Sequence, residues 1–227
     1  MKRALLLASA FLPVPALAFF DPFDGTSLGG HWDLFSEGST WTHTVSGGEL
    51  RVTALSGPFE FDEVGISAHV EGYSDFVAEV RVLWDAGTFQ TMTFGLSEQF
   101  PFMNPRIGTM GYHSRPATGA VVNASLSGGG SGSMTAPPPN QFHTFRMTRT
   151  GTLVQAFVNG SLLAQINPGS SMGANQVFLH FLGPETAEFG EFRIDYVSVV
   201  PEPGSLAAIG LGLAALAGAR KKARKRP

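Results

Sequence analysis

The 227-residue sequence contains no cysteine. This absence excludes thiol catalysis, disulfide bonds and cysteine-ligated zinc. It does not argue against secretion, because a chain of this length can bury a sufficient core without disulfides. Lysine is almost as restricted, since all four lysines lie close to one end of the chain, at Lys2, Lys221, Lys222 and Lys225.

Positive charge is therefore scarce between the two ends. Residues 19–203 carry seven basic residues, all arginine, against all 18 acidic residues, so this segment has a net charge near −11. Such a segment repels phosphate backbones, and we expect no nucleic-acid partner. The arginines are Arg51, Arg81, Arg106, Arg115, Arg146, Arg149 and Arg193.

Helical periodicity is absent before residue 204. In residues 76–84, by contrast, apolar and polar residues alternate, as in a half-buried strand. Glycine and proline separate many such runs, which predicts an all-β sandwich or barrel. The other predicted strand runs are 49–55, 64–70, 88–96, 106–112, 141–149, 152–158, 161–166, 176–182 and 189–200.

Two local patterns carry further predictions. Residues 141–166 read as a three-stranded antiparallel meander, in which Asn159-Gly160 tolerates the positive φ of a type I′ hairpin. Residues 125–140, "SLSGGGSGSMTAPPPN", combine flexible Gly/Ser with stiff proline. We expect this second segment to be a surface loop.

The N-terminus has the pattern of a secretory signal peptide over residues 1–18. A basic start precedes a short apolar run, and Ala16-Leu17-Ala18 forms an A-x-A site. Pro13 and Pro15 argue against a buried helix. We expect signal peptidase to cleave after Ala18, which leaves Phe19 as the first residue.

Residues 201–227 contain Pro201-Glu202-Pro203, an apolar run at 204–219 and a basic tail at 220–227. As a helix, the apolar run would reach about 24 Å, against a hydrocarbon core of about 30 Å. It is therefore short for a permanent anchor, although a plain C-terminal anchor is an alternative. The basic residues that would stop translocation at the cytoplasmic face are Arg220, Lys221, Lys222, Arg224, Lys225 and Arg226.

This order of proline motif, apolar helix and basic cluster closely resembles the PEP-CTERM sorting signal of Gram-negative bacteria. The resemblance implies recognition at Val200, Pro201, Glu202 and Pro203 by an exosortase, a membrane protease or transpeptidase. It also implies transient insertion into the inner membrane, removal of the tail and delivery to the cell surface or extracellular matrix. Such proteins accompany exopolysaccharide and biofilm.

Residues 19–200 resemble the concanavalin A-like lectin/glucanase domains. The opening stretch fits at Asp24-Gly25, Leu28, Trp32, Gly48, Leu50, Val52 and Ala54. The meander fits at His143, Phe145, Arg146, Arg149, Gly151, Val158, Asn159 and Gly160, and "FGEFRIDYVSVV" is similar to the last strand. The resemblance implies a two-sheet antiparallel jelly roll.

The sequence argues against catalysis. The glucanase branch carries E-x-D-x-x-E or E-x-D-x-E on one strand, whereas in "FEFDEVG" Glu60 and Asp62 are followed on the same face by Val64. Two G-x-S-x-G matches, at 25–29 and 169–173, do not lie between a strand and a helix, as a nucleophile elbow requires. We therefore predict no enzyme activity and no catalytic residues.

The sequence offers candidate residues for binding a sugar or a calcium ion. Trp41 and Tyr112 are the expected exposed aromatic platforms for a sugar, whereas Trp84 and Trp32 are expected to be structural. The histidines lack zinc-ligand spacing, and no cofactor is required. Carboxylates suit calcium among the metals, and its candidate ligands are Asp62 and Glu63, with Asp21 and Asp24 as further candidates.

The sequence thus predicts an exported, exosortase-processed surface or matrix protein. It is expected to be non-enzymatic and associated with polysaccharide. One alternative is a secreted polysaccharide-active enzyme with an unrecognised site, and another is a purely structural or adhesive module.

Overall fold

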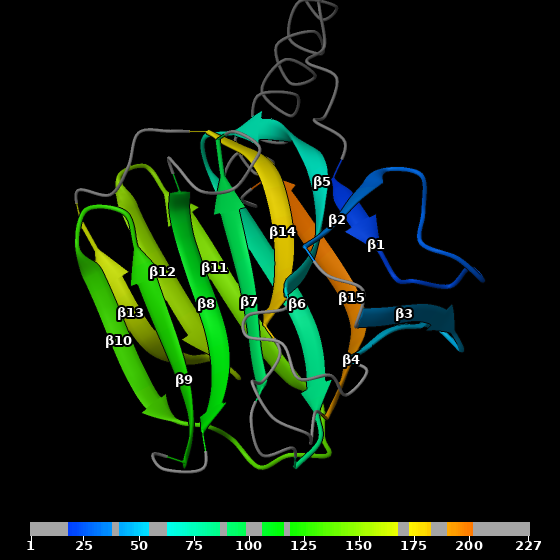
Figure 1. The fold of residues 1–227 in the computed structure, drawn as a ribbon. Helices are drawn as coiled ribbons and strands as arrows, with labels where there is room; N and C mark the ends of the chain where they lie inside the picture. Colours follow the sequence, from blue (N-terminus) through cyan, green and yellow to red (C-terminus); the bar gives the residue numbers. More distant parts are fainter. Residues whose placement is uncertain are drawn as a thin grey trace, which may run out of the picture.

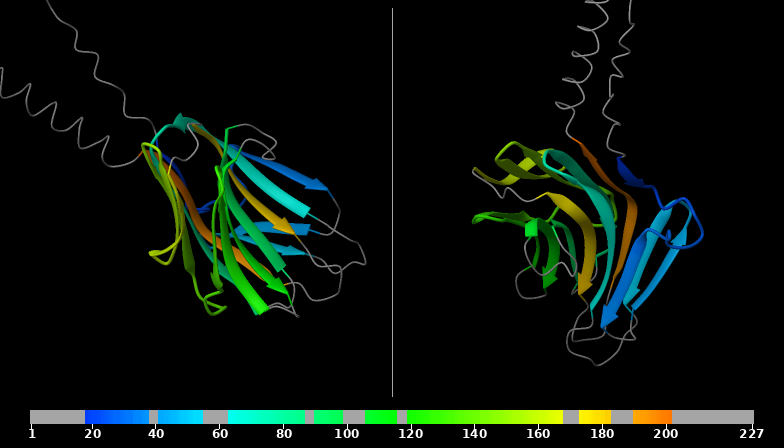
Figure 2. Two further views of the ribbon diagram at one scale, coloured as in Figure 1. Left: turned by 90° about the vertical axis from the view of Figure 1, so that its left-hand side faces the viewer. Right: turned by 90° about the horizontal axis from the view of Figure 1, so that it is seen from above.

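The computed structural model describes residues 18–37, 41–54, 63–86, 90–98, 106–115, 119–167, 173–182 and 190–201. These residues form two antiparallel β-sheets packed face to face (Figures 1 and 2). The predicted two-sheet sandwich is confirmed. No helix in this part of the chain is long and apolar enough to cross a membrane.

The first sheet, called sheet A, contains both the first and the last described strands. Its order is β13-β12-β11-β6-β15-β4-β3, and β1 pairs with β15 beside this path. The strands are β1 (Phe19–Asp21), β3 (Trp41–Ser46), β4 (Glu49–Ala54), β6 (Phe76–Trp84), β11 (His143–Thr150), β12 (Leu153–Val158), β13 (Ser161–Ile166) and β15 (Glu191–Pro201).

The second sheet, called sheet B, has the order β10-β9-β8-β7-β14-β5-β2. Its strands are β2 (Trp32–Glu37), β5 (Glu63–Tyr73), β7 (Gln90–Ser97), β8 (Arg106–Arg115), β9 (Gly119–Leu126), β10 (Gly130–Thr135) and β14 (Ala174–Leu182).

The core lies between the sheets and follows the alternation in the sequence. On β6, every second residue from Phe76 to Trp84 is at most 1% exposed. The facing strands supply Met92, Phe94 and Leu96 from β7, all fully buried. Burial of this apolar surface is the main stabilising term, since it removes hydrocarbon from water.

Each strand run predicted from the sequence overlaps a strand of the structure. Among the described residues, the pattern missed five strands: β1, β2, β3, β9 and β10. The hairpin at Asn159-Gly160 is confirmed, because the two residues have φ values of 49° and 80° and connect β12 to β13.

The prediction of a loop at 125–140 is wrong over its first part. Residues 125 and 126 end β9, and Gly130–Thr135 form β10, which pairs with β9 at the edge of sheet B. The composition favours a loop, but tertiary contacts override it. A Cβ at position 132 would lie 1.9 Å from the backbone oxygen of Leu163 in β13. Glycine is therefore needed where the edges of the two sheets meet.

Candidate functional site

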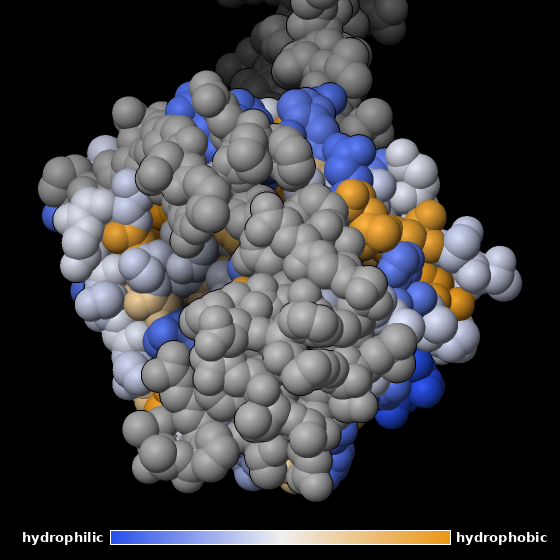
Figure 3. Space-filling view, in the orientation of Figure 1, coloured by the Kyte–Doolittle hydropathy of each residue, from blue (hydrophilic) through white to orange (hydrophobic). Residues whose placement is uncertain are grey.

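The outer face of sheet B, which faces away from the core, carries a row of hydrogen-bonded polar side chains. The Thr91 hydroxyl lies 3.2 Å from Nδ1 of His113, and Nε2 of His113 lies 3.1 Å from Oδ1 of Asn123. Thr91, His113 and Asn123 come from adjacent strands β7, β8 and β9, and we call them the polar row. In Figure 3 the surface over β9 and β10 is mostly of intermediate to polar hydropathy.

Glycine makes room for side chains that lie flat on this face. A Cβ at Gly111 would lie 2.9 Å from Nε2 of His113, so glycine allows the imidazole to reach Asn123. A Cβ at Gly95 would lie 2.3 Å from the ring of Phe178. Phe178 is 1% exposed although it points away from the main core. At the centre of this face, the side-chain rings of His113 and Phe178 therefore lie directly over the glycine residues Gly111 and Gly95.

Carboxylates are absent from the four central strands of this face. Strands β7, β8, β9 and β14 contain neither aspartate nor glutamate within their described ranges. On β5, Glu63 and Glu71 occupy positions of the same parity, but eight residues of strand separate their backbones by about 26 Å. A glycosidase pair spans roughly 5–9.5 Å, so Glu63 and Glu71 do not form such a pair with each other, although Glu63 is the cross-strand partner of Glu37 on β2.

The prediction that Tyr112 is an exposed platform is wrong. Tyr112 is 2% exposed and stacks on Trp84, with ring centroids 4.4 Å apart. The parity of β8 decides this, because Met110 and Tyr112 face inward whereas His113 faces outward. The expected structural roles of Trp84 and Trp32 are confirmed, since both are buried in the core.

Trp41 is half-buried rather than freely exposed. It lies on β3 at the edge of sheet A, packed against the core, with its ring centroid 6.2 Å from that of Phe181. Trp41 and Tyr112 therefore lie in different sheets, and the structure does not combine them into one platform.

The predicted calcium ligands that lie within the described residues are Glu63, Asp21 and Asp24. Asp62 lies outside the described residues, and Glu63 begins β5. Asp21 already accepts hydrogen bonds from the backbone N–H of Phe23 (2.7 Å), the Trp32 indole (2.6 Å) and His31 Nε2 (2.8 Å). Among the residues that the structure describes, no group of three or more His, Cys, Asp or Glu could hold a metal ion.

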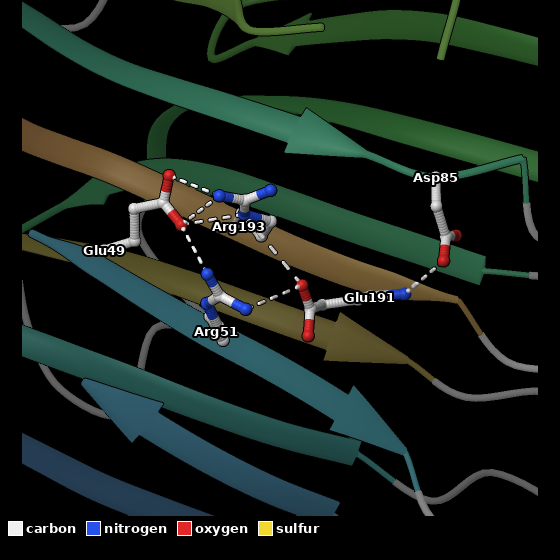
Figure 4. A network of polar contacts seen from close by, with 5 residues as sticks. All are labelled: Glu49, Arg51, Asp85, Glu191 and Arg193. Atoms are coloured by element: carbon white, nitrogen blue, oxygen red, sulfur yellow. Dashed lines mark hydrogen bonds and ion pairs between the residues drawn. The ribbon is translucent and has the colours of Figure 1, made fainter. Parts of the chain in front are cut away.

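The outer face of sheet A carries paired charges. Arg193 donates to both oxygens of Glu49 at 2.7 Å, while Arg51 bridges Glu49 (3.3 Å) and Glu191 (3.9 Å) (Figure 4). Asp85 accepts from the backbone N–H of Glu191 at 3.0 Å. Because these groups neutralise one another across β4 and β15, we assign them a structural role.

A second charged group on this face surrounds Glu79. Its carboxylate accepts from Arg146 Nε at 2.8 Å and from the Tyr196 hydroxyl. Burial and then the hydrogen bond to Glu79 raise the pKa of Tyr196 from 10.0 to about 12. The phenol is therefore neutral over the whole physiological range.

His143 and Asn159, two of the meander residues that fit the family pattern, stabilise the turn between β12 and β13. The structure orders the His143 ring so that Nε2–H donates to the carbonyl of Pro138 (2.8 Å) and Nδ1 accepts from the Asn159 amide (2.9 Å). Asn159 Oδ1 in turn accepts from the N–H of Thr144 (3.0 Å). His143 is 4% exposed. The spacing thus serves folding rather than ligand binding.

The start of the predicted sorting motif lies inside sheet A. Val199 is fully buried, and Val200 and Pro201 are half-buried and pair with Val77 and Phe76 of β6. Phe19, the expected first residue after signal cleavage, pairs with Val199. Ala16, Glu202, Pro203 and the basic cluster lie outside the described residues.

Comparison with known proteins decides what this C-terminal region is. The model of the PEP-CTERM protein-sorting motif matches residues 199–222. The chain carries a PEP-CTERM sorting motif. This motif implies an exported protein that an exosortase processes and sorts to the cell surface. No curated protein matches its sequence.

Solved structures with the same two-sheet sandwich fold include a laminarinase and a carbohydrate recognition domain. A laminarinase from Flavobacterium sp. UMI-01 has 18% identity and a TM-score of 0.62, over 82% of this chain and 99% of the laminarinase. The Emp47p carbohydrate recognition domain has 11% identity and a TM-score of 0.59, over 81% and 94%. At such identities the similarity defines the fold alone.

A third similar structure comes from work on endo-acting O-glycanases with which human gut bacteria begin mucin breakdown. It has 15% identity and a TM-score of 0.63, over 81% of this chain and 98% of that one. Enzymes and a recognition domain thus share this sandwich, so the side chains of the site must decide between hydrolysis and binding.

Proposed function

We propose that this protein is a non-enzymatic component of the cell surface or extracellular matrix of a Gram-negative bacterium, which binds exopolysaccharide through the outer face of sheet B. The observation that carries the proposal is the polar row on central strands that contain no carboxylate. The proposal includes exosortase removal of the tail and retention of the sandwich outside the cell.

The chemistry of the polar row suits a neutral sugar. Hydroxyl, imidazole and amide groups both donate and accept hydrogen bonds, as sugar hydroxyls do. Asn123 is exposed and His113 is half-buried, so these two members of the row lie near solvent, whereas Thr91 is 8% exposed and supports His113 from below. Hydrogen bonds among the side chains of the row hold them in place, which reduces the entropy lost when a ligand binds.

The same strands argue against hydrolysis. Both retaining and inverting glycosidases use two carboxyl groups across the scissile bond. A polysaccharide-active enzyme is the second candidate, favoured by the similarity of the fold to laminarinases. A purely structural or adhesive module is the third.

One experiment separates these candidates. The mature protein is applied to a glycan array, and the bound polysaccharides are then incubated with it in a reducing-sugar assay. We expect binding without product, and binding weaker by about tenfold in Asn123→Ala because a hydrogen bond to the ligand is lost. The control is Gln155→Ala, an amide on the outer face of sheet A. Release of reducing ends would support the enzyme instead.

Sorting has its own direct test. Mass spectrometry of the protein recovered from the cell surface should show a chain that begins at Phe19 and lacks residues 204–227. A surface product that retains residues 204–227 would contradict processing and favour a plain anchor.

A further inference from the structure

The outer face of sheet A carries a row of side chains that crosses six strands, and we call it the transverse row. Each member is the cross-strand partner of the next, and from β1 to β13 they are Phe20, Ser198, Glu79, Arg146, Phe157 and Leu162. Because neighbouring strands lie about 4.8 Å apart, the row is about 24 Å long. Gln155, the control in the glycan-array experiment, is not a member of this row.

Both ends of the transverse row are apolar and exposed. Phe20 is 59% exposed and Leu162 is 50% exposed, and they are two of the four exposed large apolar side chains in the described part of the chain. The Tyr196 ring widens the first end, with its centroid 5.9 Å from that of Phe20. Phe157, which is half-buried, is the partner of Leu162 at the second end. Each end thus combines an aromatic ring with apolar surface in contact with water.

The middle of the transverse row is polar and its charges are balanced. Arg146 Nε donates to Glu79 at 2.8 Å, and the Tyr196 hydroxyl donates to the same carboxylate. The Arg146 side chain is still 50% exposed, and a guanidinium has further N–H donors to offer. Because the ion pair already holds these groups in place, a ligand loses less free energy in ordering them.

This arrangement fits a neutral polysaccharide better than a protein, a membrane or a charged polymer. A stable protein interface has a contiguous apolar core and buries about 800 Å² on each partner, whereas an ion pair separates the two apolar ends of this row. The same ion pair is unfavourable against hydrocarbon, and Glu79 neutralises the cation that an acidic polymer would need. A sugar chain instead offers C–H faces to aromatic rings and hydroxyls to polar side chains along its whole length.

We propose that the transverse row is a second polysaccharide-binding site, which takes an extended, neutral chain lying across the strands of sheet A. The two sheets pack face to face, so their outer faces point in opposite directions (Figure 2). With the polar row of sheet B on the other side, one molecule holds two chains and cross-links the matrix. The cross-linking rests on the proposed function, whereas binding at the transverse row does not.

Native affinity electrophoresis of the mature protein tests the site, in gels that contain laminarin, dextran or glucomannan. The variants are Phe20→Ala and Leu162→Ala. The matched control is Leu34→Ala, because Leu34 is 48% exposed but lies on β2 of sheet B. We expect at least one polymer to retard the wild-type protein. The Kd for that polymer should rise about fivefold in Phe20→Ala and about threefold in Leu162→Ala, through the loss of one apolar contact each, and should not change in Leu34→Ala.

The Asn123→Ala variant separates this inference from the proposed function. Weaker binding in Asn123→Ala alone would overturn the inference and leave the proposed function intact. Weaker binding in Phe20→Ala and Leu162→Ala alone would support the transverse row and refute binding through sheet B. An equal loss in Leu34→Ala, or retardation in none of the gels, would overturn the inference, as would Phe20-dependent binding to phosphatidylglycerol vesicles in place of the polymers.

Light scattering tests the cross-linking. The wild-type protein mixed with the retarding polymer should form large particles, because each molecule joins two chains. Phe20→Ala and Asn123→Ala should each form fewer, since either substitution weakens one of the two faces. Particles of equal size and number in all three proteins would contradict cross-linking through the two faces.

Discussion

At the scale of single residues, Tyr196 makes the stability of the folded protein depend on pH. Its raised pKa means that the folded state favours the neutral phenol. The stabilisation is present below pH 10, where the phenol of the unfolded chain is also neutral. It is lost as the pH rises from about 10 to about 12, because the unfolded chain then gains stability by ionising.

We therefore predict that Tyr196→Phe reduces the loss of stability in this range. Thermal unfolding at pH 9 and pH 11 should show a smaller fall in Tm for the variant than for the wild-type protein. An equal fall in both proteins would show that Tyr196 ionises as freely in the folded state as in the unfolded one.

A second residue-scale feature is the Asn159 side chain, which joins His143 to the backbone of Thr144. Asn159→Gly keeps the positive φ of the turn but removes these hydrogen bonds. We expect it to cost about 1–3 kcal/mol of unfolding free energy, because the buried His143 Nδ1 loses its donor. Urea unfolding measures this cost.

Asn140→Gly is the matched control for this substitution. Asn140 also has a positive φ, of 61°, and it is exposed. Its replacement should change stability by no more than about 0.5 kcal/mol, as for other surface substitutions. A similar cost at both positions would mean that chain entropy, rather than the His143–Asn159 contact, dominates.

At the scale of elements, the edge strand β10 depends on glycine. We predict that Gly132→Ala destabilises the protein by about 1–3 kcal/mol, because its methyl group would overlap the Leu163 carbonyl of β13. Gly30→Ala is the control, since nothing lies within 4 Å of a Cβ there, and it should be neutral or slightly stabilising. Chemical unfolding of the two variants compares them, and equal stability would contradict the close approach of the two edges.

The same strand shows why sequence patterns predict only part of this fold. Long alternating strands such as β6 are evident because each second residue enters the core. Strand β10 has no such signal. Its residues Gly130 and Gly132 have no side chain to bury, and instead they let the backbone of β10 approach that of β13 closely. Its propensity indicates a loop, and only the tertiary contact makes it a strand.

The candidate site was harder to predict than the fold. Aromatic composition suggested Tyr112, but parity places that ring in the core. The polar row was missed because Thr91, His113 and Asn123 are far apart in sequence and meet only through the register of three strands. The sorting motif was predictable because its three parts are consecutive in the chain and match as a linear pattern.

At the scale of the whole molecule, the last strand, β15, lies in the middle of sheet A and joins its two parts. Its residues Phe192, Ile194, Val197 and Val199 are fully buried, and it separates β6 from β4 and β1. We predict that a chain ending at residue 190 does not fold, because two parts of the sheet lose their common neighbour. A chain ending at Pro203 should fold. Circular dichroism and protease resistance distinguish the two, and a folded shorter chain would contradict the prediction.

The central place of the last strand also sets the timing of folding during export. A polypeptide that crosses the membrane from its N-terminus presents β6, β4 and β1 first, and these strands must wait for residues 191–201 to arrive. The sheet closes only when the sorting motif itself has emerged. We therefore expect the native state to form only after residues 191–201 have crossed the membrane, and incomplete chains to stay unfolded and open to degradation.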